Sequence, residues 1–133
     1  MSGDNPVEFP TTGLGVGDVG EVIRFDVVAH GSDAVVIHVV GEVDTLTAPA
    51  LRAQLDEHIP KTPLVVLDLT EVSFLGSVGL AVMVAAEERA RAIGHTLRVV
   101  CGSRIVTRAL EATGLLGMFD IAEGVPEALA VRP

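Results

Sequence analysis

The sequence is short of cysteine, with Cys101 as the single one among 133 residues. An internal disulfide is therefore excluded, which fits a reducing compartment. A redox switch would need a second chain or a small thiol, so we expect a buried thiol at the end of a strand, the usual environment of free cysteine. The four histidines and the cysteine also lack the spacing of metal ligands, and we predict neither a metal site nor a cofactor.

Long apolar runs are also missing. The longest, Val78 to Ala86, spans nine residues and includes Gly79, whereas a helix that crosses a bilayer needs about 20 apolar residues. The first residues have no basic stretch followed by an apolar one, so no secretory signal is predicted. We expect a cytoplasmic protein that does not bind a membrane.

Positive charge is scarce, because 9 Lys and Arg face 18 Asp and Glu, for a formal net charge of −9. The resulting field repels nucleic-acid phosphates and anionic lipid surfaces, so nucleic acid is not an expected partner. The same field attracts the basic surface of a protein. The charge balance therefore favours protein partners.

The residues that are present suffice for one domain, since 49% of 133 residues are hydrophobic. No internal repeat is evident. Residues 1–21 hold five glycines and two prolines without an apolar period, which predicts a flexible N-terminal tail. The folded domain is expected to span residues 22–131.

Apolar runs rich in β-branched residues alternate with segments of helical period, and turn-forming residues separate them. The predicted strands cover residues 22–28, 34–40, 64–69, 96–100 and 118–121, and the predicted helices begin near Thr47, Ser77, Ser103 and Pro126. The first two strands are expected to form an antiparallel hairpin. Alternation after the hairpin predicts an α/β sandwich in which a mixed, mostly parallel β-sheet packs with about four α-helices.

Helix ends are marked by caps and breakers. In the first helix Thr47 can cap the start, Leu51, Leu55 and Ile59 share one face, and Pro60 stops the helix. Glycines are expected to end the next two helices, at Gly94 and Gly114.

The most informative stretch runs from Leu64 to Leu80, where a buried strand leads to one serine, Ser77, at the start of a helix. Gly76 and Gly79 flank this serine and permit a tight turn. A hydroxyl at this place is exposed at the positive end of a helix dipole. It could cap the helix, act as a nucleophile or receive a phosphate.

The capping alternative needs no function, because an N-cap serine stabilises a helix by about 1 kcal/mol. The capping-box partner is missing, however, since Leu80 stands three residues later where Glu or Gln would be expected. A purely structural role and a functional role therefore both remain open for Ser77 at this point.

The nucleophile alternative rests on a likeness to the G-x-S-x-G elbow. Leu75 stands at the first glycine position, and His95 lies at the far end of the same helix, roughly 27 Å away at helical rise. A triad would have to use His30, His38 or His58, none of which has the context of a general base. We therefore disfavour a serine hydrolase, and the lysine of a P-loop is missing as well.

The phosphorylation alternative agrees with the physical setting. Free amides and the helix dipole can receive the added charge of about −1.5 to −2, so the fold would tolerate it. If a partner covers this helix end, the same phosphate must be desolvated or repelled there. Binding would then be lost without refolding.

Several motifs occur in a characteristic order. They are Gly41–Asp44, Thr47–Ala48, Asp68–Thr70 and Phe74–Leu80. Through them the chain resembles the STAS family over about residues 22–131, and specifically the anti-sigma factor antagonists (anti-anti-sigma factors) of bacterial partner switching.

The resemblance implies a regulatory protein that is not an enzyme. It would bind an anti-sigma factor with serine kinase activity and so release a sigma factor, until that kinase phosphorylates Ser77 and a serine phosphatase resets it. The residues implied in partner binding are Asp44, Thr45, Gly76, Ser77, Val78 and Gly79.

One departure from the family pattern concerns the neighbours of Ser77. The pattern is commonly Asp-Ser-Ser/Thr-Gly-Leu, whereas this chain has Gly76 before the acceptor and Val78 after it. The acceptor is kept, but the acidic and hydroxyl neighbours are replaced. This leaves open the alternative of a STAS module that binds a protein or a ligand without being phosphorylated.

Overall fold

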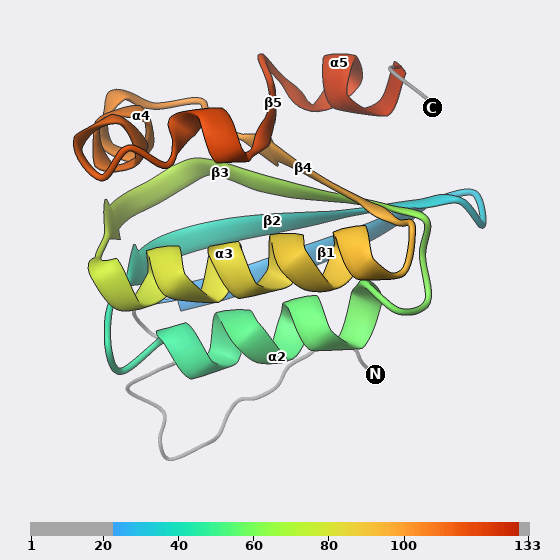
Figure 1. Ribbon diagram of the computed structural model, residues 1–133, viewed down its shortest axis with the longest axis horizontal. Coiled ribbons are helices and arrows are strands. Elements are labelled where there is room, and N and C mark those ends of the chain that lie inside the picture. The colour runs from blue at the N-terminus through green and yellow to red at the C-terminus, as the bar shows by residue number, and fades with distance from the viewer. Residues whose placement is uncertain (1–22, 131–133) are drawn as a thin grey trace.

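A computed structural model of the protein describes residues 23–130. The predicted tail at residues 1–21 lies outside this part, so its boundary stays a prediction. The elements are β1 (Ile23–His30), β2 (Ala34–Val43), α2 (Ala48–His58), β3 (Leu64–Leu75), α3 (Ser77–Ala92), β4 (Thr96–Val100), α4 (Arg104–Ala112), a 3-10 helix (Leu116–Met118), β5 (Asp120–Ala122) and α5 (Val125–Ala130) (Figure 1).

The sheet has five strands in the order β1-β2-β3-β4-β5. β1 and β2 form the expected antiparallel hairpin, and the other neighbours are parallel. This confirms the predicted mixed, mostly parallel sheet. Because β2, β3 and β4 are parallel, their carboxyl ends and the loops that follow them lie along one edge of the sheet, which we call the carboxyl edge.

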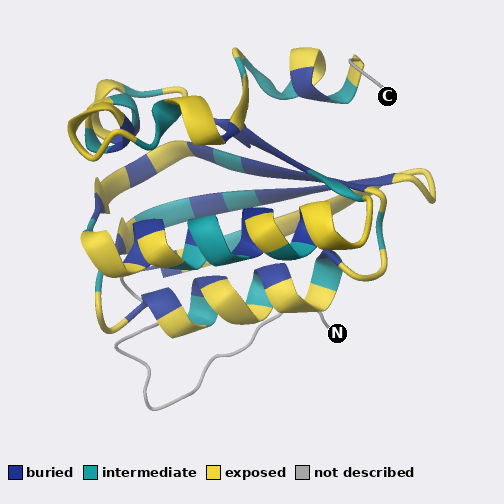
Figure 2. Ribbon diagram, viewed as in Figure 1, coloured by how far each residue is buried: buried dark blue, intermediate teal, exposed yellow. Residues whose placement is uncertain are grey.

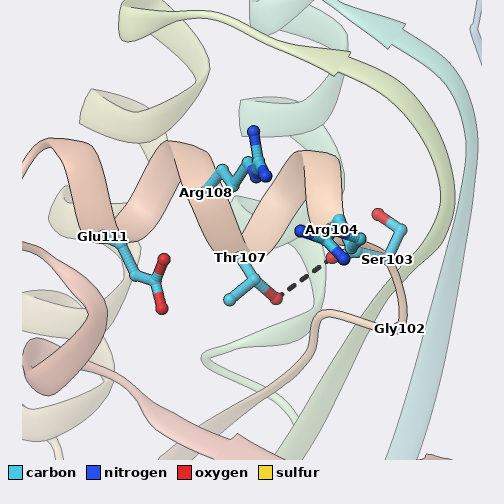
Figure 3. A pocket seen from close by; sticks show the side chains of 6 residues that line it. All are labelled: Gly102, Ser103, Arg104, Thr107, Arg108 and Glu111. Carbon is cyan, nitrogen blue, oxygen red and sulfur yellow. Dashed lines mark hydrogen bonds between the residues drawn. The ribbon is translucent and has the colours of Figure 1, made fainter.

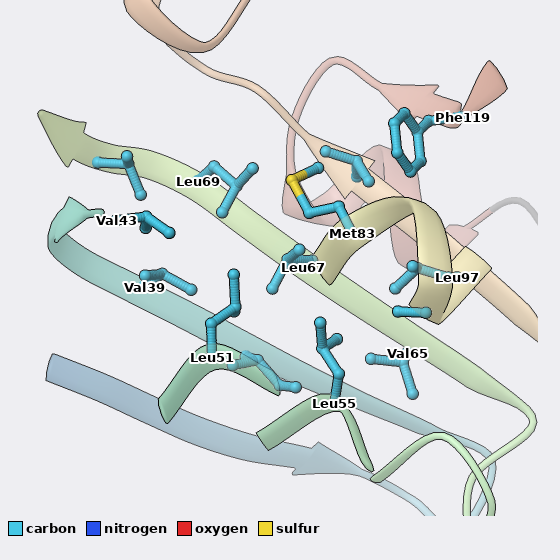
Figure 4. Close-up of a cluster of buried hydrophobic side chains, with 14 of the residues drawn as sticks. Val39, Val43, Leu51, Leu55, Val65, Leu67, Leu69, Met83, Leu97 and Phe119 are labelled. Atoms are coloured by element: carbon cyan, nitrogen blue, oxygen red, sulfur yellow. The ribbon is translucent and has the colours of Figure 1, made fainter. Parts of the chain in front are cut away.

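Both faces of the central strands are covered, which is why β2 and the first half of β3 are almost continuously apolar. α2 and α3 lie side by side on one face (Figure 1). There Leu67 packs with Leu55 and Met83 in the main core (Figure 4), to which Ile37 also belongs. Alternate residues point to the other face, where Val36 belongs to a smaller buried cluster with Ala128 of α5. Figure 2 shows the outer sides of α2 and α3 exposed.

β3 is longer than predicted, since it continues past Leu69 and ends at Leu75. Its second half has only one buried side, with Val72 and Leu75 inside. There β3 stays paired with β2 after two register shifts. Because this pairing holds the strand, it needs no continuous apolar run, and the sequence prediction relied on such a run. The last strand was also placed too early, because Met118 belongs to the 3-10 helix and β5 begins at Asp120.

The predicted buried face of α2 and the predicted glycine ends of α3 and α4 are confirmed. Leu51 and Leu55 of α2 are buried together with Ile59 just beyond its end. Gly94 and Gly114 have φ values of 75° and 73°, the left-handed conformation that ends a helix without a Cβ clash. Cys101 is buried after β4 as expected, and burial raises the pKa of its thiol.

Candidate functional site

The loop that follows β2 is organised by Asp44. Its carboxylate accepts hydrogen bonds from the backbone amides of Leu46 and Thr47, each at 3.0 Å. These donors, with the Thr47 amide contributing most, hold the pKa of the Asp44 carboxyl below its ordinary value. Asp44 is therefore a fixed negative charge at the carboxyl edge.

Thr47 stands at the N-cap position of α2 as predicted, but its hydroxyl does not cap the helix. The side chain is fully buried, and its hydroxyl donates to the Glu42 carbonyl at 2.7 Å and accepts from the Asp44 amide at 2.9 Å. Thr47 thus fastens the loop to the end of β2 instead of closing the first turn of α2.

Ser77 is the first residue of α3, and Gly76, in extended conformation, is the N-cap. The Gly76 amide donates to the Val43 carbonyl at 2.9 Å, which joins the loop after β3 to the end of β2. Ser77 is exposed, and its hydroxyl has no hydrogen-bond partner among residues 23–130. The capping alternative for Ser77 is therefore wrong.

Gly79 determines how closely α3 approaches the sheet. A Cβ at this position would lie 2.5 Å from Cγ1 of Val43 and 3.0 Å from Cδ1 of Leu75, so a side chain would push the helix away. Gly79 is buried. The structure gives it a packing role, and its predicted contact with a partner stays a prediction.

The other predicted partner-binding residues meet at the carboxyl edge. Asp44 and Thr45 follow β2, while Gly76, Ser77 and Val78 follow β3. Thr45, Ser77 and Val78 are exposed, and Asp44 and Gly76 are partly exposed. One connected surface therefore holds an exposed hydroxyl beside a fixed carboxylate.

Two exposed apolar side chains at this edge were not among the predicted partner-binding residues. Leu46 is 61% exposed and Phe74 is 50% exposed, and Val78 at the same edge is 39% exposed. The Phe74 ring lies over Gly76, because a Cβ there would come within 3.1 Å of it. Exposed apolar side chains gathered at one place mark binding surfaces. The sequence carries no signal of this exposure, because Leu46 and Phe74 both stand beside apolar segments of the core.

The histidines lie away from Ser77. His95 follows the C-terminal end of α3, and its Nδ1 is 2.8 Å from the carbonyl oxygen of Ile59. His38 lies on β2, and its Nδ1 is 2.7 Å from the carboxylate of Asp68 on β3. His30 ends β1 opposite the start of β2, and His58 ends α2. Within the described part of the chain, no histidine therefore lies beside the Ser77 hydroxyl as a general base.

Among residues 23–130, no group of three or more His, Cys, Asp or Glu side chains could hold a metal ion. No helix in the same range is long and apolar enough to cross a membrane.

Comparisons with known proteins agree on one family. The model of the STAS domain family matches residues 25–128. The chain is 33% identical to the anti-sigma-F factor antagonist RsfB of Mycobacterium tuberculosis over 105 residues, which cover 77% of this chain and 84% of the relative. It is 34% identical to the anti-sigma-B factor antagonist of Listeria monocytogenes over 100 residues, covering 74% and 88%.

A solved structure gives the same result. The crystal structure of an anti-sigma factor antagonist from Mycobacterium paratuberculosis matches with a TM-score of 0.71 and 31% sequence identity, covering 83% of this chain and 93% of that one. The resemblance that the sequence motifs predicted is thereby confirmed.

Proposed function

Because this chain belongs to the STAS domain family, we propose that it is an anti-sigma factor antagonist whose binding is switched off by phosphorylation of Ser77. In the unphosphorylated form it binds an anti-sigma factor with serine kinase activity and so frees a sigma factor. A serine phosphatase restores this form, and the exchange takes place in the cytoplasm. The names of the relatives support the antagonist role.

The observation that carries the switch is the hydroxyl of Ser77 at the start of α3, which is exposed and has no hydrogen-bond partner in the described part of the chain. The kinase would transfer the γ-phosphoryl group of ATP to Oγ of Ser77, so that an O–P bond forms, ADP leaves and the hydroxyl proton is released. The first amides of a helix have no partner within the helix and can solvate the phosphate. The fold is expected to persist.

Loss of binding follows from the surroundings of the phosphate. Leu46, Phe74 and Val78 offer apolar area that a partner would desolvate. A phosphate of about −1.5 to −2 charge among them would have to lose water on binding, and it would add to the negative charge of Asp44. The partner would be released while the antagonist stays folded.

The same local sequence supports a second candidate function, constitutive binding without phosphorylation. Gly76 and Val78 replace the acidic and hydroxyl neighbours common in the family, and Phe74 occupies the space over Gly76. An apolar surface of this kind can bind a protein without covalent change.

Phosphorylation is tested by incubating the protein with its cognate anti-sigma factor and ATP, followed by intact-mass measurement. We expect a gain of one phosphate in the wild type and in Ser73→Ala, and no gain in Ser77→Ala. Ser73 is a matched control because it is an exposed serine of the neighbouring strand. An undiminished gain in Ser77→Ala would contradict the assignment, and no gain in the wild type would favour constitutive binding.

Electrostatic release is tested by the affinity of Ser77→Glu for the same anti-sigma factor. We expect at least tenfold weaker binding than for Ser77→Ala, because the introduced carboxylate would be an unpaired charge at the interface. A tenfold change in affinity corresponds to about 1.4 kcal/mol. The melting temperatures of the two variants should agree. Equal affinities would argue against release by charge.

A further inference from the structure

Most cations of this acidic chain are neutralised within the molecule. Eight Lys and Arg residues lie in the range 23–130, and six of them form ion pairs. The pairs are Arg24–Asp26, Arg52–Asp56, Lys61–Glu57, Arg89–Asp56, Arg91–Glu87 and Arg98–Asp120. In this part of the chain, only Arg104 and Arg108 have no acidic partner.

Arg104 and Arg108 lie on one side of α4. They are four residues apart and hence about 40° apart around the helix axis. Ile105, which is half-exposed, follows Arg104 directly and lies about 100° from it around the axis. Two like charges at this spacing repel each other and weaken a helix. The arrangement therefore does not serve the stability of α4.

The two arginines line an open hollow with Gly102, Ser103, Thr107 and Glu111 (Figure 3). Glu111 is the acidic residue of this hollow, and its carboxylate points away from the Arg108 guanidinium in Figure 3. The Thr107 hydroxyl donates to the Ser103 carbonyl at 3.0 Å, so it is already satisfied. The positively charged donors of the hollow are the two guanidinium groups, and no ion pair engages them within residues 23–130.

This surface belongs to the same edge as Ser77. α4 follows β4, which is parallel to β3, and α4 packs against β3. Figure 1 shows α4 at the end of the molecule where α3 begins. The carboxyl edge is therefore negative at Asp44 and positive at α4.

We propose that Arg104 and Arg108, with Ile105 beside them, form a second contact surface for an acidic segment of the anti-sigma factor bound at Ser77. This inference rests on the proposed function. Charge complementarity carries it, because two unpaired arginines in a chain of net charge −9 fit carboxylates of a partner bidentately. The openness of the hollow and the exposed isoleucine favour a protein segment over a small anion. Opposite charges at the two ends of the edge would also fix the orientation of the partner.

The test compares two charge-reversed variants for binding to the cognate anti-sigma factor at low and high salt. Arg104→Glu/Arg108→Glu reverses the proposed surface. Lys61→Glu/Arg91→Glu makes the same change of charge on exposed residues near the C-terminal ends of α2 and α3, away from Ser77. Thermal melting checks that both variants are folded.

We expect the Arg104→Glu/Arg108→Glu variant to bind about tenfold more weakly than the control variant at low salt, mainly through slower association. The difference should shrink at high salt because exposed charges are screened, and Arg104→Lys/Arg108→Lys should keep most of the affinity. Equal loss in the two reversed variants would overturn this inference alone. No binding by the wild type would overturn the proposed function and this inference with it.

Discussion

Gly79 sets the distance between α3 and the end of β2, because no Cβ stands between the helix and Val43. The hydroxyl of Ser77, two residues earlier, is placed by this approach and by the bond from the Gly76 amide to the Val43 carbonyl. Asp44 at the same edge is held in place because its carboxylate accepts hydrogen bonds from two backbone amides of its own loop. Single residues thus fix the relative position of the acceptor and the carboxylate.

Gly79→Ala is expected to destabilise the protein by about 1–3 kcal/mol, the usual cost of overpacking. The added methyl group would meet Cγ1 of Val43 at 2.5 Å and Cδ1 of Leu75 at 3.0 Å, so these buried side chains or the helix would have to shift. Urea unfolding measures the loss. Gly117→Ala is the control, since a Cβ there meets nothing within 4 Å, and it should stay within about 0.5 kcal/mol of the wild type. Similar stabilities for the two variants would contradict the tight approach at Gly79.

Asp44→Asn is expected to lower the melting temperature at neutral pH and to matter less in acid. The folded protein holds the pKa of Asp44 below its ordinary value of 3.8. The ionised carboxylate therefore stabilises the fold above that value, and this contribution is lost as the pH falls through the lower folded pKa. Melting curves between pH 7 and about pH 3 should show the gap between variant and wild type closing.

The control for Asp44→Asn is Asp33→Asn, which removes an exposed carboxylate. Among residues 23–130, this carboxylate accepts a hydrogen bond only from the Ser32 hydroxyl, at 3.4 Å. The gap of the control variant from the wild type should be smaller at neutral pH. A gap for Asp44→Asn that persists unchanged in acid would show that the charge of Asp44 is not what stabilises the loop.

At the scale of elements, two helices begin with a serine, and the two serines do different things. Ser103 is the N-cap of α4, and its side chain accepts from the Val106 amide at 3.4 Å. Ser77 stands one position later in α3, after the N-cap Gly76, and its hydroxyl makes no capping hydrogen bond to the helix. The sequence motif is similar, but only one hydroxyl is engaged by its own helix.

Ser103→Ala should therefore cost about 0.5–1 kcal/mol of stability, toward the low end for a cap because the bond is long. Ser77→Ala should stay within about 0.5 kcal/mol of the wild type, because nothing in the helix depends on its hydroxyl. Urea unfolding of the two variants measures both. A larger loss for Ser77→Ala than for Ser103→Ala would mean that Ser77 caps its helix after all.

The elements that the sequence predicted well are those whose own residues carry the periodicity. The face of Leu51, Leu55 and Ile59 is visible in the sequence, since a helix buries every third or fourth residue whatever covers it. The second half of β3 was missed because its strand form depends on pairing with β2, where only Val72 and Leu75 are buried.

The site divides in the same way. Ser77 could be found from its flanking glycines and the strand before it. The role of Thr47 could not, because its hydroxyl bonds to Glu42, five residues earlier, and that choice depends on the path of the loop. The exposure of Leu46 and Phe74 was equally hidden, since apolar residues beside a core motif resemble core residues until the covering elements are known.

At the scale of the whole molecule, the residues that hold the fold and those offered to a partner are separate. Buried side chains lie between the sheet and its covering helices on both faces. The exposed apolar side chains near Ser77 lie beyond that core, at the carboxyl edge. A change of binding at this edge therefore need not alter the stability of the domain, which is what a switch without refolding requires.

Two leucines test this separation. Leu55→Ala should lower the free energy of unfolding by about 2–5 kcal/mol, because this side chain is fully buried between α2 and the sheet and its loss leaves a cavity. Leu46→Ala should leave stability within about 0.5 kcal/mol of the wild type and weaken binding to the anti-sigma factor about fivefold. Its backbone amide still donates to Asp44, so the loop is kept. Unfolding and binding are measured on the same preparations, and unchanged binding in Leu46→Ala would remove Leu46 from the contact surface.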